Sequence, residues 1–222
     1  RDSAGSTCFE TNEWLKGRRR IEMIIKQLEI GDMDNFCYIL GCEKTRKALV
    51  IDPGADVARI VAAAEKEGLA IEMIVNSHAH GDHTAGNTPL KALTGAKIIL
   101  HERDAAGYPQ ADVRLSDEKT LQLGAITIDV IQTPGHTPGG ICLHAQGNLF
   151  TGDTLFVGDS GRTDLPGGDR PTLGASIRRL MKLPDDTVVW PGHDYGPTPS
   201  STIGWEKRHN VNAREYGYYV GD

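Results

Sequence analysis

The sequence H-A-H-G-D-H occupies residues 78–83. It follows a mainly apolar run at residues 71–75 and two polar residues at 76 and 77. It packs four side chains of metal-binding type into six residues at the end of a predicted strand. Side chains of an extended chain alternate between two faces, so His78, His80 and Asp82 are expected to point the same way. The last histidine of the motif opens a segment with helical apolar spacing. One short loop can therefore serve two adjacent metal positions.

Three later strands also lead to a residue of metal-binding type, and a glycine beside each such residue permits a tight loop. The complete set of candidate metal ligands is His78, His80, Asp82, His83, His136, Asp153 and His193. Five imidazoles and two carboxylates suit zinc, iron or manganese. Seven side chains are too many for one tetrahedral ion, but they suit two neighbouring ions that share a bridging carboxylate.

Short runs of β-forming residues alternate with helical segments along the chain. Strands are expected at residues 21–25, 36–40, 48–51, 71–75, 98–100, 125–131, 141–144, 149–151 and 187–190. Helices are expected at residues 57–66, 83–93, 172–183 and 202–213, with Gly68 as the C-cap of the first. This alternation predicts a layered α/β or α+β fold. We expect a single domain at residues 21–222, preceded by an N-terminal arm at residues 1–20.

The composition is ordinary for a globular protein and argues against several classes of partner. A net charge of −6 over 222 residues argues against a broad nucleic-acid surface. The chain has no apolar stretch near the roughly 20 residues that span a bilayer. Four cysteines at unrelated spacings predict neither a zinc knuckle nor a disulfide framework. We therefore expect a cytoplasmic protein without nucleic-acid or membrane partners, in which Cys37 and Cys142 are buried in strands.

The motif H-x-H-x-D-H, followed by a distant His, Asp and His, resembles the signature of the metallo-β-lactamase-fold hydrolases. The resemblance covers roughly residues 21–222 and implies an αββα sandwich with the metals at one edge of the paired sheets. It implies that His78, His80 and His136 hold the first metal. It implies that Asp82, His83 and His193 hold the second, with Asp153 as the bridge. Two zinc ions are expected, with iron or manganese as alternatives.

The resemblance also implies a chemistry. A bound metal lowers the pKa of water from about 15.7 toward 7, and two ions can share the resulting hydroxide and present it to a carbonyl carbon. Asp82 is the candidate catalytic residue, because it is expected to orient this hydroxide as well as to bind metal. Asn76 and Ser77 are expected either to support the histidines or to cap the loop.

Motifs narrow the choice of branch within this family. Zinc β-lactamases lack a bridging aspartate such as Asp153, and flavodiiron oxygen reductases carry Glu at the position of His80. RNA-processing members are longer and carry RNA-binding surfaces. Two branches remain, and the first is the short, single-domain, glyoxalase-II-like hydrolases. Its P-G-H motif matches residues 191–193, but too few residues follow for the C-terminal helical domain of glyoxalase II.

The second branch is persulfide dioxygenase, which oxidises glutathione persulfide with O2. The G-R-T-D segment at residues 161–164 and the H-D-Y segment at residues 193–195 resemble that family. The C-terminal segment, with S-T-I-G at 201–204 and E-K-R-H-N at 206–210, does so too. The resemblance implies a single Fe(II), and its ligands would be His78, His136 and Asp153. Short glyoxalase-like hydrolases share the G-R-T-D segment and the terminal helix, so these motifs do not separate the branches.

We expect a binuclear hydrolase that cleaves a thioester or related acyl ester, with persulfide dioxygenase as the alternative. The expected partner is a small-molecule thioester or glutathione-type thiol conjugate, and a homo-oligomer is left open. Arg162 and Tyr195 are the candidate substrate contacts, because each lies close in sequence to a candidate ligand. Among the remaining histidines, His101 is expected on the surface at a helix start, and His144 and His209 are expected to be structural.

Overall fold

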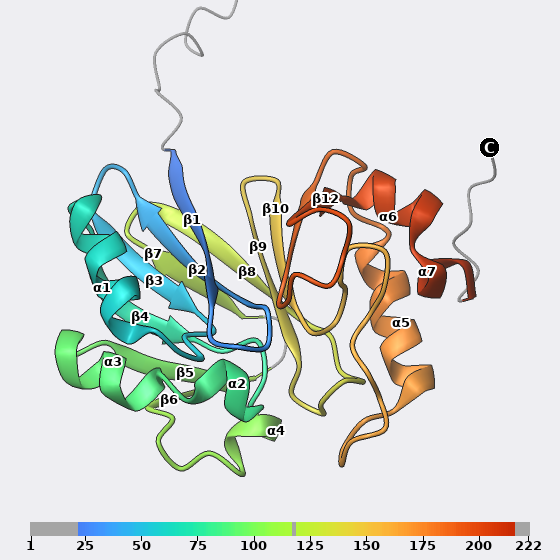
Figure 1. The fold of residues 1–222 in the computed structure, drawn as a ribbon, viewed down its shortest axis with the longest axis horizontal. Helices are drawn as coiled ribbons and strands as arrows, with labels where there is room; N and C mark the ends of the chain where they lie inside the picture. Colours follow the sequence, from blue (N-terminus) through green and yellow to red (C-terminus); the bar gives the residue numbers. More distant parts are fainter. Residues whose placement is uncertain (1–21, 117–118, 216–222) are drawn as a thin grey trace, which may run out of the picture.

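The computed structural model describes residues 22–116 and 119–215, so the expected N-terminal arm lies outside the described residues. Two six-stranded sheets pack face to face, and helices cover the outer face of each sheet (Figure 1). This arrangement is the αββα sandwich that the sequence motif implies. Within the described ranges, none of the helices is long and apolar enough to span a membrane.

The first sheet has the strand order β1-β2-β3-β4-β5-β6. Its strands are β1 (Met23–Ile30), β2 (Asn35–Cys42), β3 (Lys47–Ile51), β4 (Ala70–Val75), β5 (Lys97–His101) and β6 (Val113–Leu115). The first three strands are antiparallel neighbours, and β3 to β6 are parallel. Parallel neighbours need crossover connections, which here contain helices. These helices are α1 (Val57–Lys66), α2 (Gly81–Thr84), α3 (Asn87–Thr94) and α4 (Glu102–Ala105).

The second sheet has the order β12-β11-β10-β9-β8-β7. Its strands are β7 (Thr120–Leu123), β8 (Ile126–Gln132), β9 (Ile141–Ala145), β10 (Asn148–Gly152), β11 (Val188–Pro191) and β12 (Ser201–Thr202). Only β10 and β11 are parallel, and α5 (Arg170–Leu180) lies in the connection between them. The chain continues beyond β12 into α6 (Ile203–His209) and α7 (Val211–Glu215).

The alternation of side chains along β2 explains the layers. Tyr38 and Leu40 belong to the core between the sheets, whereas Cys37 and Ile39 belong to the core under the helices of the first sheet. Both faces of β2 are therefore buried, which is why the strand has no charged residue and only one polar side chain, Asn35. On the second sheet, α5 covers the outer face with Leu173, Ile177 and Leu180. Cys142 is buried in that same layer, so the predicted burial of Cys37 and Cys142 is confirmed.

Helix α1 has the predicted bounds, and Gly68 ends it as expected. The Gly68 N–H donates to the Glu65 carbonyl (2.8 Å), and the Leu69 N–H donates to the Ala64 carbonyl (2.9 Å). Gly68 has φ +62°, in the left-handed region that glycine adopts at little cost. These two bonds form a Schellman motif, which satisfies the last carbonyls of the helix and turns the chain into β4.

Other predicted bounds are wrong for identifiable reasons. Strand β1 extends to Ile30, beyond its predicted end. The prediction stopped short because β1 is an edge strand with polar residues, Gln27 and Glu29, that mask its apolar pattern. Strands β6, β7 and β12 are not among the predicted strands. Each has four residues or fewer, which is too short for a recognisable alternation. The predicted helix 83–93 is two helices, α2 and α3. The predicted helix 172–183 begins earlier, because Asp169 caps α5 by accepting a hydrogen bond from the Thr172 N–H (2.8 Å).

The predicted helix 202–213 is also wrong, because Asn210 divides it into α6 and α7. Asn210 has an extended backbone (φ −69°, ψ 124°). Its side-chain oxygen Oδ1 accepts hydrogen bonds from the main-chain N–H groups of Asn212 and Ala213. Its amide donates to the Asp159 carbonyl (2.9 Å) and the Phe156 carbonyl (3.3 Å). A side chain that bonds to backbone in this way competes with helix continuation. Asn210 thereby ties the C-terminal helices to the loop after β10.

Main-chain hydrogen bonds also join the two sheets near the ends of their strands. The Phe36 N–H of β2 donates to the Gly192 carbonyl (2.8 Å), and the Ile141 N–H of β9 donates to the Ser77 carbonyl (2.9 Å). Gly192 and Ser77 each immediately precede a candidate ligand in the sequence. The loops that carry these histidines are therefore anchored in both sheets.

Glu206 of α6 is buried against the loop after β10. Its carboxylate accepts hydrogen bonds from the Gly158 N–H (3.0 Å), the Asn210 amide (2.8 Å) and the Ser201 hydroxyl. Burial raises the pKa of Glu206 above its ordinary value, and these hydrogen bonds oppose the rise without cancelling it. The folded state therefore binds a proton at Glu206 more tightly than the unfolded chain does.

We predict that Glu206→Gln removes a pH-dependent part of the stability. A raised folded-state pKa contributes stability that is complete below the unfolded pKa and is lost as pH rises through the folded pKa. Glutamine keeps the shape but does not titrate, so the stability of the variant relative to wild type should rise over the pH range above the ordinary glutamate pKa of about 4.3. The measurement is the free energy of unfolding in urea across this range. Glu72→Gln, at an exposed carboxylate paired with Lys47, is the control. Parallel curves for Glu206→Gln and wild type would contradict the prediction.

Candidate metal centre

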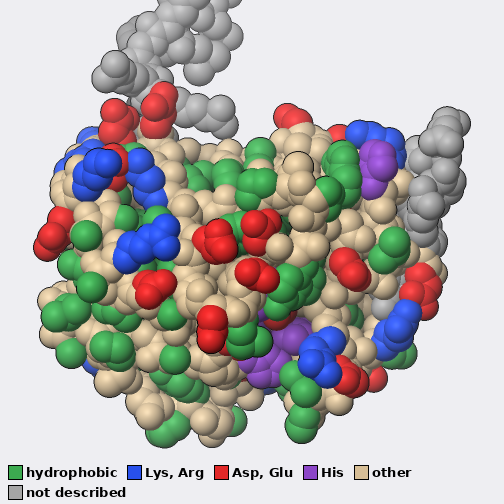
Figure 2. Space-filling model, viewed as in Figure 1, with side chains coloured by type: hydrophobic (Ala, Val, Ile, Leu, Met, Phe, Trp, Pro, Cys, Tyr) green, Lys and Arg blue, Asp and Glu red, His purple; other side chains and the backbone are tan. Residues whose placement is uncertain are grey.

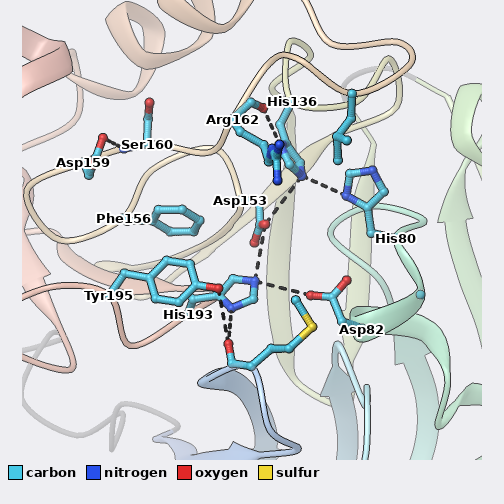
Figure 3. A pocket seen from close by; sticks show the side chains of 13 residues that line it. His80, Asp82, His136, Asp153, Phe156, Asp159, Ser160, Arg162, His193 and Tyr195 are labelled. Atoms are coloured by element: carbon cyan, nitrogen blue, oxygen red, sulfur yellow. Dashed lines mark hydrogen bonds and ion pairs between the residues drawn. The ribbon is translucent and has the colours of Figure 1, made fainter.

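The seven candidate ligands meet at one end of the paired sheets. Two lie in the loop after β4, two on α2, and one each after β8, β10 and β11. Five of them line a cavity of about 480 Å³, namely His80, Asp82, His136, Asp153 and His193 (Figure 3). Figure 2 shows histidine side chains reaching the surface at the lower centre of the molecule, with acidic side chains above them. Side chains from both sheets therefore form a single site.

Six of the seven side chains fall into two groups of three. The first donor group is His78, His80 and His136, and the second donor group is Asp82, His83 and His193; within each, the ligand-type atoms lie within 4.8 Å of one another. In the first, His80 Nδ1 lies 2.9 Å from His136 Nε2. In the second, His83 Nε2 lies 3.2 Å from His193 Nε2 and 3.3 Å from Asp82 Oδ2. These are the two groups that the sequence motif implies.

Asp153 lies between the two donor groups. Its Oδ2 is 3.5 Å from His136 Nε2 and 3.4 Å from His193 Nε2, and its Oδ1 is 3.3 Å from His83 Nε2. One carboxylate thus faces a histidine of the first donor group and two of the second. This is the placement expected of a bridging residue.

Hydrogen bonds behind the histidines set which ring nitrogen faces the site. His136 Nδ1 lies 2.7 Å from the Arg162 carbonyl, and His193 Nδ1 lies 2.9 Å from the Met33 carbonyl. A carbonyl only accepts, so each of these Nδ1 atoms carries a proton, and Nε2 is the ring nitrogen that is directed toward the other candidate ligands. His83 Nδ1 lies 3.1 Å from a carboxylate oxygen of Asp52, which has the same effect.

Asp52 is a functional residue that the sequence analysis missed. It is buried at the end of β3 and accepts hydrogen bonds from the Ser77 N–H (2.7 Å) and the Ser77 hydroxyl (2.6 Å). Ser77 Oγ in turn lies 3.0 Å from His78 Nδ1. Asp52 therefore supports a histidine of each donor group. The D-P-G sequence at residues 52–54 is the only local signal, and it indicates a turn rather than a supporting carboxylate.

Asn35 and Asn76 support the site in a similar way. The Asn35 amide donates to Asp82 Oδ2 (2.9 Å), and the Asn76 amide donates to the carbonyl of His83 (2.9 Å). Both asparagines are buried. Ser77 thus supports the ring of His78, as one of the two expectations had it, whereas Asn76 bonds to the main chain of the loop, as the other had it. Asn35 carries no sequence signal, because a single asparagine at the start of a strand matches no motif.

The charges of the site suit a cation. Burial holds the pKa of His78 well below its ordinary value, which keeps the ring neutral with a lone pair available. Burial raises the pKa of Asp153, but the charge of the neighbouring His83 and the hydrogen bond from His193 lower it by more. The net pKa is well below its ordinary value, so the carboxylate is ionised. Burial lowers the pKa of His83, but the carboxylates of Asp153 and Asp52 outweigh it and hold this pKa well above its ordinary value. A positive charge is therefore favoured among these carboxylates.

Two buried atoms test whether the donor set fits metal ions. His78 Nε2 and Asp153 Oδ1 have no hydrogen-bond partner, although both are fully enclosed. A buried polar atom without a partner costs about 1–3 kcal/mol. A divalent ion would supply the missing partner of each atom, and imidazole and carboxylate are suitable ligands for zinc, iron and manganese. The residues present therefore fit a metal centre.

Both predicted substrate contacts line the cavity (Figure 3). The guanidinium of Arg162 is bonded through two nitrogens to the Asp164 carboxylate (2.6 and 2.7 Å), and this pairing lowers the pKa of Asp164 to about 2. The ring of Tyr195 stacks on His193 at 4.6 Å between centroids, and its hydroxyl donates to the Met33 carbonyl (3.3 Å). Further lining residues that the sequence analysis missed are Met33, Phe156, Asp159, Ser160 and Leu165.

The remaining histidines lie away from the cavity. His101 caps α4, so the predicted helix start is confirmed, but the predicted surface position is wrong because the side chain is buried. The residue ends the apolar strand β5, which enters the core before the chain turns. His144 is half-buried on β9, and His209 stacks on Trp205 at 4.6 Å between centroids.

Comparison with known proteins gives one family and two kinds of relative. Residues 30–193 match the model of the metallo-beta-lactamase superfamily. The chain is 38% identical over 179 residues to a hydroxyacylglutathione hydrolase of Polaromonas sp. strain JS666, a match that covers 78% of this chain and 67% of that protein. It is 34% identical over 204 residues to the mitochondrial persulfide dioxygenase ETHE1 of Homo sapiens, which covers 90% of this chain and 78% of that protein.

Solved structures also superpose closely on this chain. ETHE1 from Myxococcus xanthus superposes with a TM-score of 0.82 at 33% identity, covering 89% of this chain and 88% of that one. TTHA1623 in a di-iron-bound form superposes with a TM-score of 0.74 at 31% identity, covering 84% of this chain and 98% of that one. These similarities establish the fold and the family, and the identity to the hydroxyacylglutathione hydrolase (38%) is close to the identity to the persulfide dioxygenase (34%).

We predict that divalent metal stabilises the metal-free protein. Zn(II) at about 100 times its dissociation constant should add about 2.7 kcal/mol per ion. For a chain of this size that corresponds to a rise in Tm of roughly 5–10 °C per ion. The measurement is thermal unfolding after chelation, with and without added Zn(II). Mg(II), which prefers oxygen ligands, is the control and should have little effect. An unchanged Tm with Zn(II) would contradict the metal centre.

Proposed function

We propose that this chain, which belongs to the metallo-β-lactamase superfamily, is a metal-dependent hydrolase of a thioester or related acyl ester. The observation that carries the proposal is the pair of three-residue donor groups with Asp153 between them. Two groups on either side of one carboxylate suit a binuclear site better than a single ion. Zinc is the proposed metal, with iron or manganese as alternatives.

In this proposal the ligands are assigned as the donor groups suggest. The first ion would be held by His78, His80 and His136. The second would be held by Asp82, His83 and His193, and Asp153 would bridge the two. Bound ions of this kind lower the pKa of water toward 7 and polarise a carbonyl oxygen.

Asp82 is proposed as the catalytic residue. It lines the cavity, and its Oδ2 is held by the Asn35 amide at 2.9 Å. Burial raises its pKa, but the hydrogen bond and charge of His83 and the bond from Asn35 outweigh this and lower it, so the carboxylate is ionised. An ionised carboxylate in this position can hold a metal ion and accept a hydrogen bond from a water molecule or hydroxide, so that its oxygen is oriented toward an acyl carbon.

The cavity wall is proposed to bind the thiol carrier. Met33, Phe156 and Tyr195 provide an apolar surface at the cavity, and Phe156 contacts the Tyr195 ring edge-on at 5.4 Å between centroids. Arg162 supplies a guanidinium at the same wall. Its pair with Asp164 is exposed, and such pairs are weak, so the guanidinium can exchange to a carboxylate of a glutathione-type carrier.

Persulfide dioxygenase is the second candidate, and one observation favours it. The two buried atoms without partners, His78 Nε2 and Asp153 Oδ1, belong to the trio that this activity would use. With His136, they would form a two-histidine, one-carboxylate set, which suits a single Fe(II). The 34% identity to the human persulfide dioxygenase supports the same alternative.

Metal stoichiometry separates the two candidates. We predict two ions per chain after reconstitution with Zn(II), with cleavage of S-lactoylglutathione following occupancy by the second ion. The measurement is elemental analysis beside thioester hydrolysis, carried out separately for Zn(II) and Fe(II) protein. One iron per chain that persists under excess metal, with O2 uptake on glutathione persulfide and no thioester cleavage, would contradict the hydrolase.

We predict that Asp82→Asn lowers kcat for thioester cleavage by about 10²-fold or more, because a neutral amide neither holds the second ion as a carboxylate does nor orients the hydroxide. The dioxygenase trio does not include Asp82, so that activity would largely survive the substitution. Asp129→Asn, at an exposed position on β8, is the matched control and should leave kcat unchanged. A hydrolase that keeps its kcat in Asp82→Asn would refute the assignment of this residue.

A further inference from the structure

Asp104 is a buried carboxylate on α4 that touches both loops of the first donor group. Its Oδ2 accepts a hydrogen bond from the Ala79 N–H (3.0 Å) and another from the Thr137 hydroxyl (2.8 Å). Its Oδ1 accepts a third from the Gly139 N–H (2.6 Å). Ala79 stands between two histidines of the first donor group, and Thr137 directly follows the third.

These contacts bridge the two sheets. The Ala79 loop leaves β4 of the first sheet, whereas Thr137 and Gly139 lie in the loop between β8 and β9 of the second. A single side chain therefore fastens all the segments that carry His78, His80 and His136. The packing is close at Gly139, where a Cβ would lie 2.6 Å from both the Asp104 backbone nitrogen and Oδ1. Only glycine allows the second loop to approach Asp104 so closely.

We propose that Asp104 is a positioning residue that sets the distance between the imidazoles of the first donor group and so determines how tightly that group holds metal. The inference rests on the proposed function for the assignment of this group to a metal ion. The inference adds Asp104 to the residues that support the site. Asp104 contacts the main chain and a hydroxyl of the ligand loops, not the imidazole rings themselves. Asp52 has the corresponding place behind His83 of the second donor group.

The chemistry of the contacts requires a carboxylate at this position. Three donors converge on two oxygens, and both oxygens of an ionised Asp accept. Asparagine has one accepting oxygen, so its NH2 group would face the N–H of either Ala79 or Gly139. One main-chain N–H would then lose its acceptor and one loop would move away from the other. Asp104→Asn therefore keeps the size of the side chain but breaks the bridge.

The test is the metal affinity of full-length Asp104→Asn, measured with Zn(II) and Co(II) against a competing chelator. Loss of a hydrogen-bond partner behind metal ligands typically weakens affinity 10–100-fold. We expect a loss of this size for one of the two ions, accompanied by a changed Co(II) visible spectrum. Thr137→Val removes one of the three bonds without altering the carboxylate, and it should give a smaller loss. This milder variant keeps the test decisive if Asp104→Asn folds poorly.

Asp112→Asn is the matched control. Asp112 is also an aspartate with main-chain and side-chain partners, since it accepts bonds from the Ile98 N–H (2.9 Å) and from Lys91. It joins β5 to α3 and touches neither ligand loop. The control should lower the free energy of unfolding while leaving both metal affinities unchanged. If the role of Asp104 is merely structural, Asp104→Asn should also lower the free energy of unfolding and leave both metal affinities unchanged.

Two ligand variants assign the affected ion. In a His193→Ala background, which leaves the first donor group intact, Asp104→Asn should still weaken the remaining ion 10–100-fold. In a His80→Ala background, which leaves the second donor group intact, it should change the remaining affinity little. Unchanged affinity in Asp104→Asn and Thr137→Val would overturn this inference and leave the hydrolase proposal standing. A wild-type chain that binds no divalent ion would overturn the proposed function, and this inference with it.

Discussion

Tyr38 makes the contact between the sheets on which the site depends. It lies on β2 of the first sheet, and its hydroxyl donates to the Pro191 carbonyl of β11 in the second (2.5 Å). Its ring packs edge-on against Phe150 and Trp190, with centroids 5.1 and 6.0 Å apart. Pro191 lies two residues before His193. The ligand loops come from different sheets, so their mutual distances are set by how these sheets are held together.

Aspartates provide the second constraint. Asp52, Asp104 and Asp153 are all buried within or behind the histidines, at a desolvation cost that partners must offset. Asp52 and Asp104 meet that cost with main-chain N–H groups and hydroxyls, which also fix the loops. Asp153 faces three histidines instead, and one of its oxygens lacks a hydrogen-bond partner. The carboxylate left under-satisfied is the one between the two donor groups.

Much of this arrangement could be predicted from the sequence, because the ligand-type residues follow recognisable strands. The motif at residues 78–83 and the glycines beside His136, Asp153 and His193 indicated one site at one sheet edge. The supporting residues were not predictable in the same way, since Asn35 and Asp104 are single residues whose partners are distant in sequence. The break at Asn210 was missed for a related reason. Its helix-ending contacts are made with the loop after β10, which only the folded chain brings close.

The loop after β10 is hydrogen-bonded to the C-terminal helices. This arrangement separates the residues that shape the cavity from most of those that support the histidines. Phe156, Asp159 and Ser160 line the cavity, and they are held by Glu206, Asn210 and Asn212 of α6, α7 and their junction. His136 bonds to the Arg162 carbonyl of this same loop, whereas His78, His83 and His193 bond to Ser77, Asp52 and the Met33 carbonyl in other parts of the fold. Descendants of such a chain can therefore diverge in what they recognise, through changes in the last two helices, while inheriting most of the supports of the reactive centre.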